Sequence, residues 1–235
     1  MQTLPEQLED PLSAAIAERD SKTLEMVQVA LDRKNVMLAY QPVMQVQGGQ
    51  VAFYEGLIRV LDDTGRIIPA REFIGVAETT ELGRIIDCLA LEQALIALAE
   101  TPDLRLAVNL SARSIGYRRW TETLERGLTE HPTVGERLIL EITESSAILM
   151  PDIVTAFMKD LHLKGIASSP DNQVLARALV SIATHFEMFT VAESVENEDD
   201  ATFLAQIGID CLQGYLYGAP SISPPFHARS QRRLA

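Results

Sequence analysis

The spacing of hydrophobic residues divides the N-terminal part of the chain into a helical segment and a hairpin. Over residues 7–34, apolar side chains recur mostly at helical intervals, which predicts one leading helix or two. Apolar residues then dominate 36–44 and 51–59, and Gln47-Gly48-Gly49-Gln50 lies between these two runs. A tight turn between two such runs predicts an antiparallel β-hairpin.

After the hairpin, helical and strand-like segments alternate. The predicted helices occupy residues 71–77, 82–99, 120–129, 151–161, 172–185 and 199–207, and the predicted strands occupy residues 104–110, 138–142, 165–167, 190–193 and 211–214. Such alternation is typical of a mostly parallel sheet covered by helices. We therefore predict an α/β fold in three parts: an N-terminal helical segment at 1–35, the main domain at 36–220 and a C-terminal tail at 221–235.

Polar side chains stand at the ends of the predicted strands. They are Glu55, Asn109, Glu141 followed by Glu144, Glu193 followed by Glu196, and Gln213. In α/β barrels the carboxyl ends of the strands converge on one face, where the chemistry takes place. A single carboxylate there is usually a solvated loop residue or a helix cap, but several carboxylates with an amide indicate a shared site. Oxygen donors of this kind suit hard divalent cations such as Mg²⁺ or Mn²⁺.

Composition and charge narrow the class of protein. The chain has 235 residues, of which 47% are hydrophobic and 23% charged, as expected of one large α/β domain or two small ones. Its net charge of -13 argues against a DNA or RNA polymer or an anionic membrane as partner. No apolar run reaches the roughly 20 residues of a membrane span, and the N-terminus lacks the pattern of a secretory signal. Cys88 and Cys211 are expected to be buried thiols, so we expect a cytoplasmic protein.

Six short motifs along the chain carry a family resemblance. They are Tyr40-Gln41-Pro42, Glu55-Gly56-Leu57 with Arg59, Val108-Asn109-Leu110-Ser111, Glu141-Ile142-Thr143-Glu144, Ala192-Glu193-Ser194-Val195-Glu196 and Gln213-Gly214-Tyr215. In this order and spacing they resemble the EAL-domain cyclic di-GMP phosphodiesterases, from about residue 36 to residue 220. The resemblance implies a (β/α)8-type, TIM-like EAL barrel with an antiparallel first strand, which agrees with the predicted hairpin.

The resemblance also implies an activity and a ligand set. Members of this family hydrolyse cyclic di-GMP to the linear dinucleotide with two metal ions, Mg²⁺ or Mn²⁺, and commonly form homodimers. By the match, the metal ligands would be Glu55, Asn109, Glu141 and Glu193. Gln213 would help to position the attacking water, and Glu144 would anchor the loop over the site. Gln41, Arg59 and Asn109 would contact the substrate, and a guanidinium there suits a phosphate.

Two departures from the family pattern are exchanges of one small residue for another. Gly56 stands where the motif that gives the family its name has Ala. Ser194 stands where the family usually has Gly. Both are exchanges between small residues, so we regard these two departures as mild.

A third departure removes part of the predicted centre. After Ala167 the family has a strand ending in Asp-Asp-Phe-Gly, a helix, and a strand ending near Lys-Ile-Asp, whereas only 22 residues (168–189) separate Ala167 from the next predicted strand. A strand–helix–strand unit takes about 30 residues, so one strand and one helix are absent. Either the sequence skips roughly 30 to 40 residues or the protein has lost them. If the protein contains the segment, we expect a two-metal cyclic di-GMP phosphodiesterase. Without the aspartates and the lysine, we expect the 235-residue chain to be catalytically inactive, and the alternative function is a cyclic di-GMP-binding or protein-interaction module.

Overall fold

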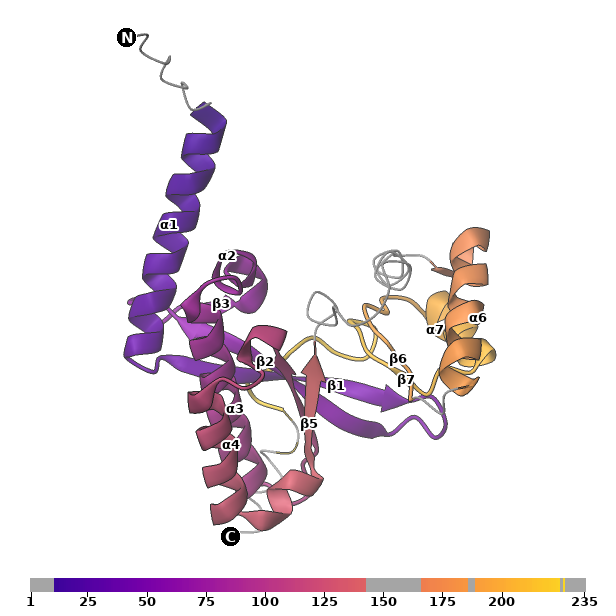
Figure 1. Ribbon diagram of the computed structural model, residues 1–235. Helices are drawn as coiled ribbons and strands as arrows, with labels where there is room; N and C mark the ends of the chain where they lie inside the picture. Colours follow the sequence, from indigo (N-terminus) through magenta and orange to yellow (C-terminus); the bar gives the residue numbers. More distant parts are fainter. Residues whose placement is uncertain (1–10, 143–165, 186–188, 225, 227–235) are drawn as a thin grey trace.

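The computed structural model of the protein describes residues 11–142, 166–185, 189–224 and 226. It forms a curled sheet with helices packed along its outer side (Figure 1). The first half contains the elements α1 (Pro11–Asp32), β1 (Val36–Gln45), β2 (Val51–Leu61), β3 (Ile67–Pro69), η1 (Ala70–Glu72), α2 (Ile74–Ala77), α3 (Glu81–Glu100) and β4 (Leu106–Leu110). The second half contains η2 (Ala112–Ser114), α4 (Arg118–Glu130), η3 (Pro132–Glu136), β5 (Leu138–Ile142), η5 (Ile166–Ser168), α6 (Pro170–His185), β6 (Val191–Ala192), α7 (Glu198–Ile207) and β7 (Cys211–Leu212).

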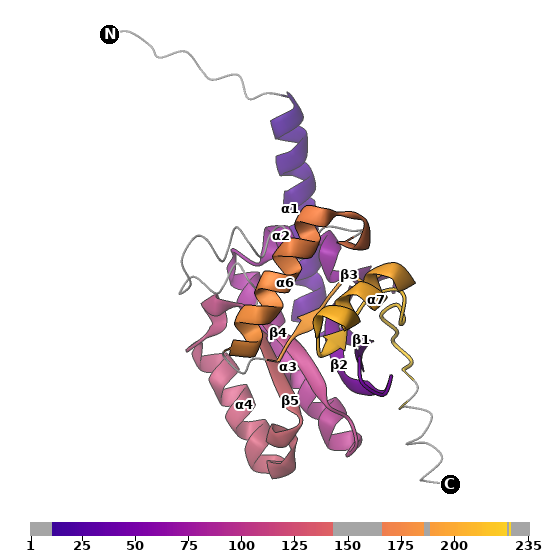
Figure 2. The ribbon, with the colours of Figure 1, turned by 90° about the vertical axis from the view of Figure 1, so that its right-hand side faces the viewer.

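The sheet runs in the order β5-β4-β2-β1-β7-β6, with β3 paired to β2. Strand β1 is antiparallel to both of its neighbours, β2 and β7, whereas β2, β4 and β5 are parallel to one another and β6 is parallel to β7. The antiparallel first strand predicted from the hairpin is therefore confirmed. The sheet curls into part of a barrel, with the helices on its convex side (Figures 1 and 2).

The largest hydrophobic core lies between this sheet and the helices α1 to α4. Helix α3 contributes most to it, since Leu89, Leu91 and Leu98 are almost fully buried against the sheet and α4. Burying each such side chain stabilises the fold by about 1.5–3 kcal/mol before entropy is counted. A smaller core joins η5, α6, α7 and β7 through Val195, Leu204 and neighbours. The packing thus fixes the outer side of the sheet and leaves the carboxyl ends of its strands for the site.

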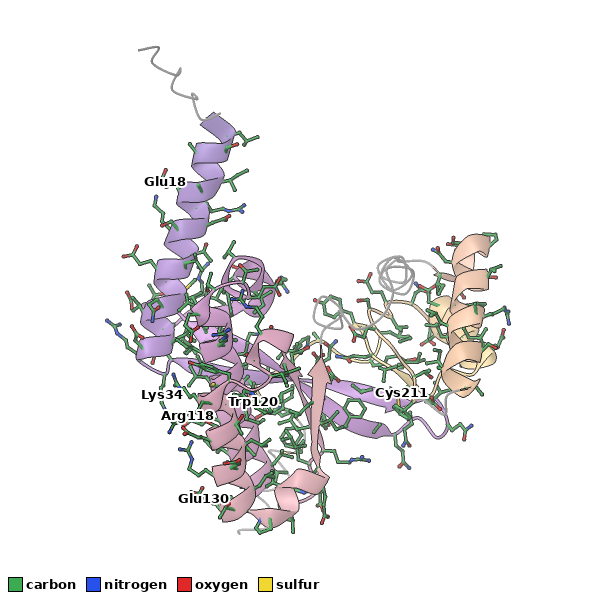
Figure 3. All side chains as sticks on the ribbon, viewed as in Figure 1. Glu18, Lys34, Arg118, Trp120, Glu130 and Cys211 are labelled. Carbon is green, nitrogen blue, oxygen red and sulfur yellow. The ribbon has the colours of Figure 1, made fainter. Side chains whose placement is uncertain are left out.

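Helix α1 and Phe226 both pack against the barrel. The C-terminal part of α1 is buried at Val27, Ala30 and Leu31, while its N-terminal part stands away from the body (Figure 1). Figure 3 shows Glu18 projecting from that free part and Trp120 turned toward the body. At the other end of the chain, Phe226 packs edge-on against Tyr40 and Tyr54, with ring centroids 5.0 and 4.9 Å apart. None of the helices in the described ranges has the length and apolar character to cross a membrane.

The segment between β5 and β6 differs from the predicted pattern. The sequence predicts a strand at 165–167, but Ile166–Ser168 forms a 3-10 turn whose carbonyl at Ile166 accepts a hydrogen bond from the Ser169 amide. This prediction was wrong because Ser169-Pro170 starts helix α6 immediately afterwards. The predicted helix at 151–161 falls outside the described residues. Within 166–185 and 189–190 the described chain contains no strand, as expected if one unit is absent.

Candidate functional site

Glu55 lies at the centre of a cluster of amide and carboxylate side chains. It stands on β2, and its two carboxylate oxygens accept hydrogen bonds from two different strands. The Asn109 Nδ2 donates to Glu55 Oε1 at 2.7 Å, and the Gln213 Nε2 donates to Glu55 Oε2 at 2.6 Å. Asn109 is on β4, parallel to β2, and Gln213 directly follows β7. The structure therefore brings together three side chains that the strand-end pattern selected, although Glu55 lies within β2 and not at its end.

Gln41 extends the cluster onto the antiparallel strand. It pairs with Glu55 across the β1–β2 register. The Gln213 Nε2 also donates to Gln41 Oε1 at 3.1 Å, and Gln41 Nε2 donates to the Gly218 carbonyl at 3.1 Å. Gln41 is 8% and Gln213 6% exposed, so both amides are held by protein partners rather than by water. Gly218, which accepts from Gln41, is a site residue that the sequence patterns did not select.

Glu141 and Glu193 complete the strand-end carboxylates. Glu141 pairs with Asn109 across the parallel β4–β5 register, and Glu193 is exposed directly after β6. Burial, followed by the negative charges of Glu55 and Glu193, raises the pKa of Glu141 to about 7. Glu55 and Glu193 are thus close enough to Glu141 for their charges to raise its pKa. Glu144, predicted to anchor the loop over the site, lies outside the described residues.

Arg59 lies on the same face of β2 as Glu55, since the two residues are four apart on one strand. Its Nη1 donates to the carbonyls of Leu57 and Ile58 on its own strand at 3.3 and 2.9 Å. Burial and the positive charge of Arg71 lower the pKa of Arg59, whereas Glu55 raises it. Arg59 is therefore a half-buried cation beside the cluster, and in the described part of the chain its side chain donates to carbonyls of β2.

The carboxylates and amide have the donor chemistry of a site for a hard divalent cation. Oxygen atoms are available from Glu55, Glu141, Glu193 and Asn109. A bound cation would offset the negative charges of the three glutamates. In this arrangement, however, no three His, Cys, Asp or Glu side chains in the described part of the chain are close enough to hold an ion. The paired aspartates of the family, which would bridge two ions, are absent from the sequence. The residues fit one cation in kind and do not supply a two-ion centre.

The loop after β6 crosses directly over the segment after β7. The Val195 amide donates to the Gln213 carbonyl at 3.0 Å, and the Leu216 amide donates to the Val195 carbonyl at 3.1 Å. A Cβ atom on Gly214 would lie 2.0 Å from the Val195 carbonyl oxygen, so only glycine permits this crossing. The crossing holds Gln213 and the Glu193 loop together at the site.

Ser194, in the same loop, has a left-handed backbone conformation with φ of 58°. A side chain costs roughly 1–2 kcal/mol in this region, which gives a physical reason for the glycine that the family usually has here. The expectation that serine is a mild replacement at position 194 took only side-chain size into account. The structure shows that the backbone conformation is what matters at this position. The strain falls on the residue directly after Glu193, where backbone strain often accompanies a functional site.

Replacement of Ser194 by glycine is therefore expected to stabilise the protein. We expect the free energy of unfolding to rise by about 1 kcal/mol, because glycine relieves the left-handed strain at some entropic cost. Urea denaturation followed by circular dichroism measures this value. As a matched control, Ser181→Gly in the exposed face of α6 should lower the stability by up to about 1 kcal/mol. A Ser194→Gly variant that is less stable than the unchanged protein would contradict the prediction.

The comparison with protein families agrees with this site. The EAL domain family model matches residues 24–169 and 162–220, and the chain therefore belongs to the EAL domain family. The two matched segments meet at 162–169, the place where the sequence predicts a missing unit. A match that breaks there is expected if an internal stretch is absent.

Two curated relatives align with this chain over more positions than the chain itself supplies. The chain is 26% identical to the bifunctional diguanylate cyclase/cyclic di-GMP phosphodiesterase MucR of Pseudomonas aeruginosa over 246 positions, covering 88% of this chain and 36% of MucR. It is 27% identical to the cyclic di-GMP phosphodiesterase PdeF of Escherichia coli over 234 positions, covering 83% of this chain and 31% of PdeF. Since 88% and 83% of 235 residues fall short of those lengths, roughly 40 positions of each alignment face a gap, about one strand–helix–strand unit. The chain spans about a third of the length of these relatives.

Solved structures establish the fold. The EAL domain of Xanthomonas citri FimX, solved in complex with c-diGMP, matches with a TM-score of 0.72 and 22% identity, over 91% of this chain and 99% of that domain. The MucR phosphodiesterase in its c-di-GMP complex matches with a TM-score of 0.67 and 24% identity, over 88% of this chain and 99% of that chain. The protein therefore has the TIM-like EAL barrel fold, of which the described residues form a curled part with an antiparallel first strand.

Proposed function

We propose that this chain is a cyclic di-GMP domain of the EAL type, which hydrolyses its ligand only when it carries the unit that follows Ala167 in the family. The observation that carries the proposal is the cluster in which Glu55, within β2, joins Asn109 near the end of β4 and Gln213 directly after β7. Membership of the EAL family and the phosphodiesterase names of MucR and PdeF support it. We call the protein that contains this unit the longer form.

The chain's own residues divide into a ligand-binding set and a structural set. Arg59 offers a permanent positive charge beside Glu55 and suits a phosphate of cyclic di-GMP. Asn109 and Gln41 offer amides that can exchange their present partners for those of a ligand. Gln213 holds Glu55 and Gln41 together, so its role is to orient both. These side chains support ligand binding by the 235-residue chain.

Hydrolysis requires more than these residues provide. A divalent cation, Mg²⁺ or Mn²⁺, held by Glu55, Asn109, Glu141 and Glu193 would supply Lewis-acid stabilisation of phosphate charge. The family's paired aspartates and lysine are absent from the sequence, so the 235-residue chain lacks the side chains that would complete a two-ion centre. For this chain the second candidate function, capture of cyclic di-GMP without turnover, is therefore favoured. A homodimer and a cytoplasmic location stay predictions.

The test begins with the intact mass of the purified protein. A mass near 25.9 kDa identifies the 235-residue chain, for which we expect binding of cyclic di-GMP by calorimetry and turnover slower than in the longer form by more than about a hundredfold. Losing even a residue that supports a metal ligand costs about 10- to 100-fold. A larger mass identifies the longer form, for which we expect hydrolysis with Mg²⁺ or Mn²⁺.

A matched control inserts the missing unit. A family segment of about one strand–helix–strand unit is placed after Ala167, and hydrolysis to the linear dinucleotide is measured with and without the insertion. We expect turnover only with the insertion. Efficient turnover by the 25.9 kDa chain would overturn the assignment of the catalytic step, and failure of both forms to bind cyclic di-GMP would overturn the proposed ligand.

A further inference from the structure

A buried carboxylate on α3 holds the loop that follows β4. Asp87 is 9% exposed, and its Oδ2 accepts hydrogen bonds from the Ser111 amide at 3.1 Å and the Ser114 Oγ at 2.6 Å. Ser114 is fully buried, so its hydroxyl has no access to water. Burial raises the pKa of Asp87, and the hydrogen bonds from Ser114 and Ser111 oppose the rise. Removing the carboxylate would leave buried donors without an acceptor.

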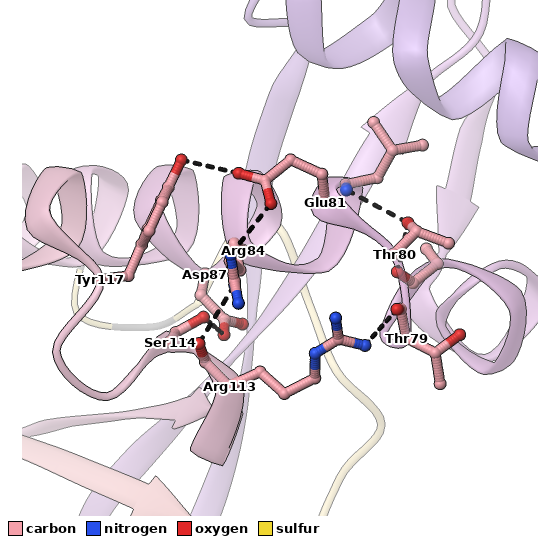
Figure 4. Close-up of polar contacts among 10 residues, drawn as sticks. Thr79, Thr80, Glu81, Arg84, Asp87, Arg113, Ser114 and Tyr117 are labelled. Carbon is pink, nitrogen blue, oxygen red and sulfur yellow. Dashed lines mark hydrogen bonds and ion pairs between the residues drawn. The ribbon is translucent and has the colours of Figure 1, made fainter.

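Further contacts tie the same loop to α3 (Figure 4). Arg84, one turn before Asp87, donates its Nε to the Arg113 carbonyl at 3.2 Å and lies 5.4 Å from the centre of the Tyr117 ring. The Tyr117 hydroxyl donates to Glu81 Oε1 at 2.9 Å, and Arg113 donates to the Thr79 carbonyl. These contacts are more exposed than those of Asp87, which therefore forms the buried centre of the anchor.

The anchored loop begins two residues after Asn109. Asn109 is the penultimate residue of β4, and its Nδ2 donates to Glu55 at 2.7 Å. The position of the Ser111 amide limits how the end of β4 can shift or rotate. We infer that Asp87 is a positioning residue, which fixes the β4 end through Ser111 and Ser114 so that the Asn109 amide faces Glu55.

The inference rests on the proposed function only where it predicts weaker binding of cyclic di-GMP. The orientation of Asn109 can be measured without a ligand. The chain has four asparagines, at positions 35, 109, 172 and 197, so selective labelling with ¹⁵N-asparagine gives four pairs of side-chain amide signals. The Asn109 pair is the one that disappears in Asn109→Asp.

The experiment compares Asp87→Ala, Asp87→Asn and Ser114→Ala with a control at a second buried aspartate. Asp200 is 6% exposed and accepts a hydrogen bond from the Ala167 amide at 2.8 Å, so Asp200→Ala removes a comparable anchor on the other side of the barrel. Nuclear magnetic resonance records the Asn109 signals, calorimetry gives the Kd for cyclic di-GMP, and thermal unfolding gives Tm for each variant.

We expect Asp87→Ala and Ser114→Ala to shift the Asn109 signals and Asp87→Ala to raise the Kd by about tenfold. Asp87→Asn keeps an oxygen in the accepting position and should restore both readouts. Asp200→Ala should lower Tm and leave the Asn109 signals in place.

Unchanged Asn109 signals in the folded Asp87→Ala protein would overturn the inference. If Asp87→Ala fails to fold, Ser114→Ala decides on the same signals. If the unchanged protein does not bind cyclic di-GMP, the proposed function fails, while the Asn109 signals still decide whether Asp87 positions this side chain.

Discussion

Glu55→Ala is expected to abolish hydrolysis in the longer form, with a loss of more than about a hundredfold. The Glu55 carboxylate joins β2 to both Asn109 and Gln213. It would also supply oxygen to a divalent cation. The substitution therefore removes one metal-binding side chain and takes away the acceptor that holds the Asn109 and Gln213 amides. Turnover of cyclic di-GMP to the linear dinucleotide measures the effect.

The same variant is expected to remain folded. Gln213 keeps its hydrogen bond to Gln41, and shortening the half-buried Glu55 side chain leaves space for water at the amides that lose their acceptor. We expect the free energy of unfolding to fall by about 1–2 kcal/mol. A suitable control is Glu92→Ala, which removes a glutamate bonded to Lys34 outside the site and should leave turnover unchanged. Retained turnover in Glu55→Ala would show that the assignment of Glu55 is wrong.

The central cluster was predictable from the sequence because its geometry follows from strand direction. Asn109 and Gln213 close short apolar runs at the carboxyl ends of β4 and β7, which meet at one edge of the sheet. Glu55 lies within β2, so the prediction that it ends its strand was wrong. Gln41 lies on an antiparallel strand, so strand ends alone did not select it. Its selection came from the family resemblance, and in the structure its Oε1 accepts a hydrogen bond from Gln213.

Other features depend on contacts between distant segments, which a local pattern does not contain. Asp87 is one polar residue within a mostly apolar helix, and its partners Ser111 and Ser114 lie 24 and 27 residues further along the chain. The left-handed backbone of Ser194 follows from the loop that crosses above Gly214. Ile166–Ser168 forms a 3-10 turn because the following residues start a helix, a competition that a three-residue apolar pattern cannot reveal.

Gly214→Ala is expected to destabilise the protein by about 3 kcal/mol or more, the upper range for overpacking. The added Cβ would lie 2.0 Å from the Val195 carbonyl oxygen and 2.3 Å from the Val195 amide nitrogen. Both atoms belong to a backbone that is hydrogen-bonded to Gln213 and Leu216, so no side-chain rotation relieves the contact. Either the Val195 segment moves and those bonds break, or the protein unfolds. Urea denaturation measures the free energy of unfolding, and cyclic di-GMP affinity reports on the site.

The control is Gly75→Ala in α2, where no atom lies within 4 Å of an added Cβ. There alanine should raise the stability by about 0.5–1 kcal/mol, because it restricts the unfolded chain and favours helix. The pair separates the general cost of replacing glycine from the cost of blocking the crossing. If Gly214→Ala were as stable as Gly75→Ala, the Val195 segment could not lie where this structure has it. Because that segment connects Glu193 to Gln213, the same result would also separate two members of the proposed site.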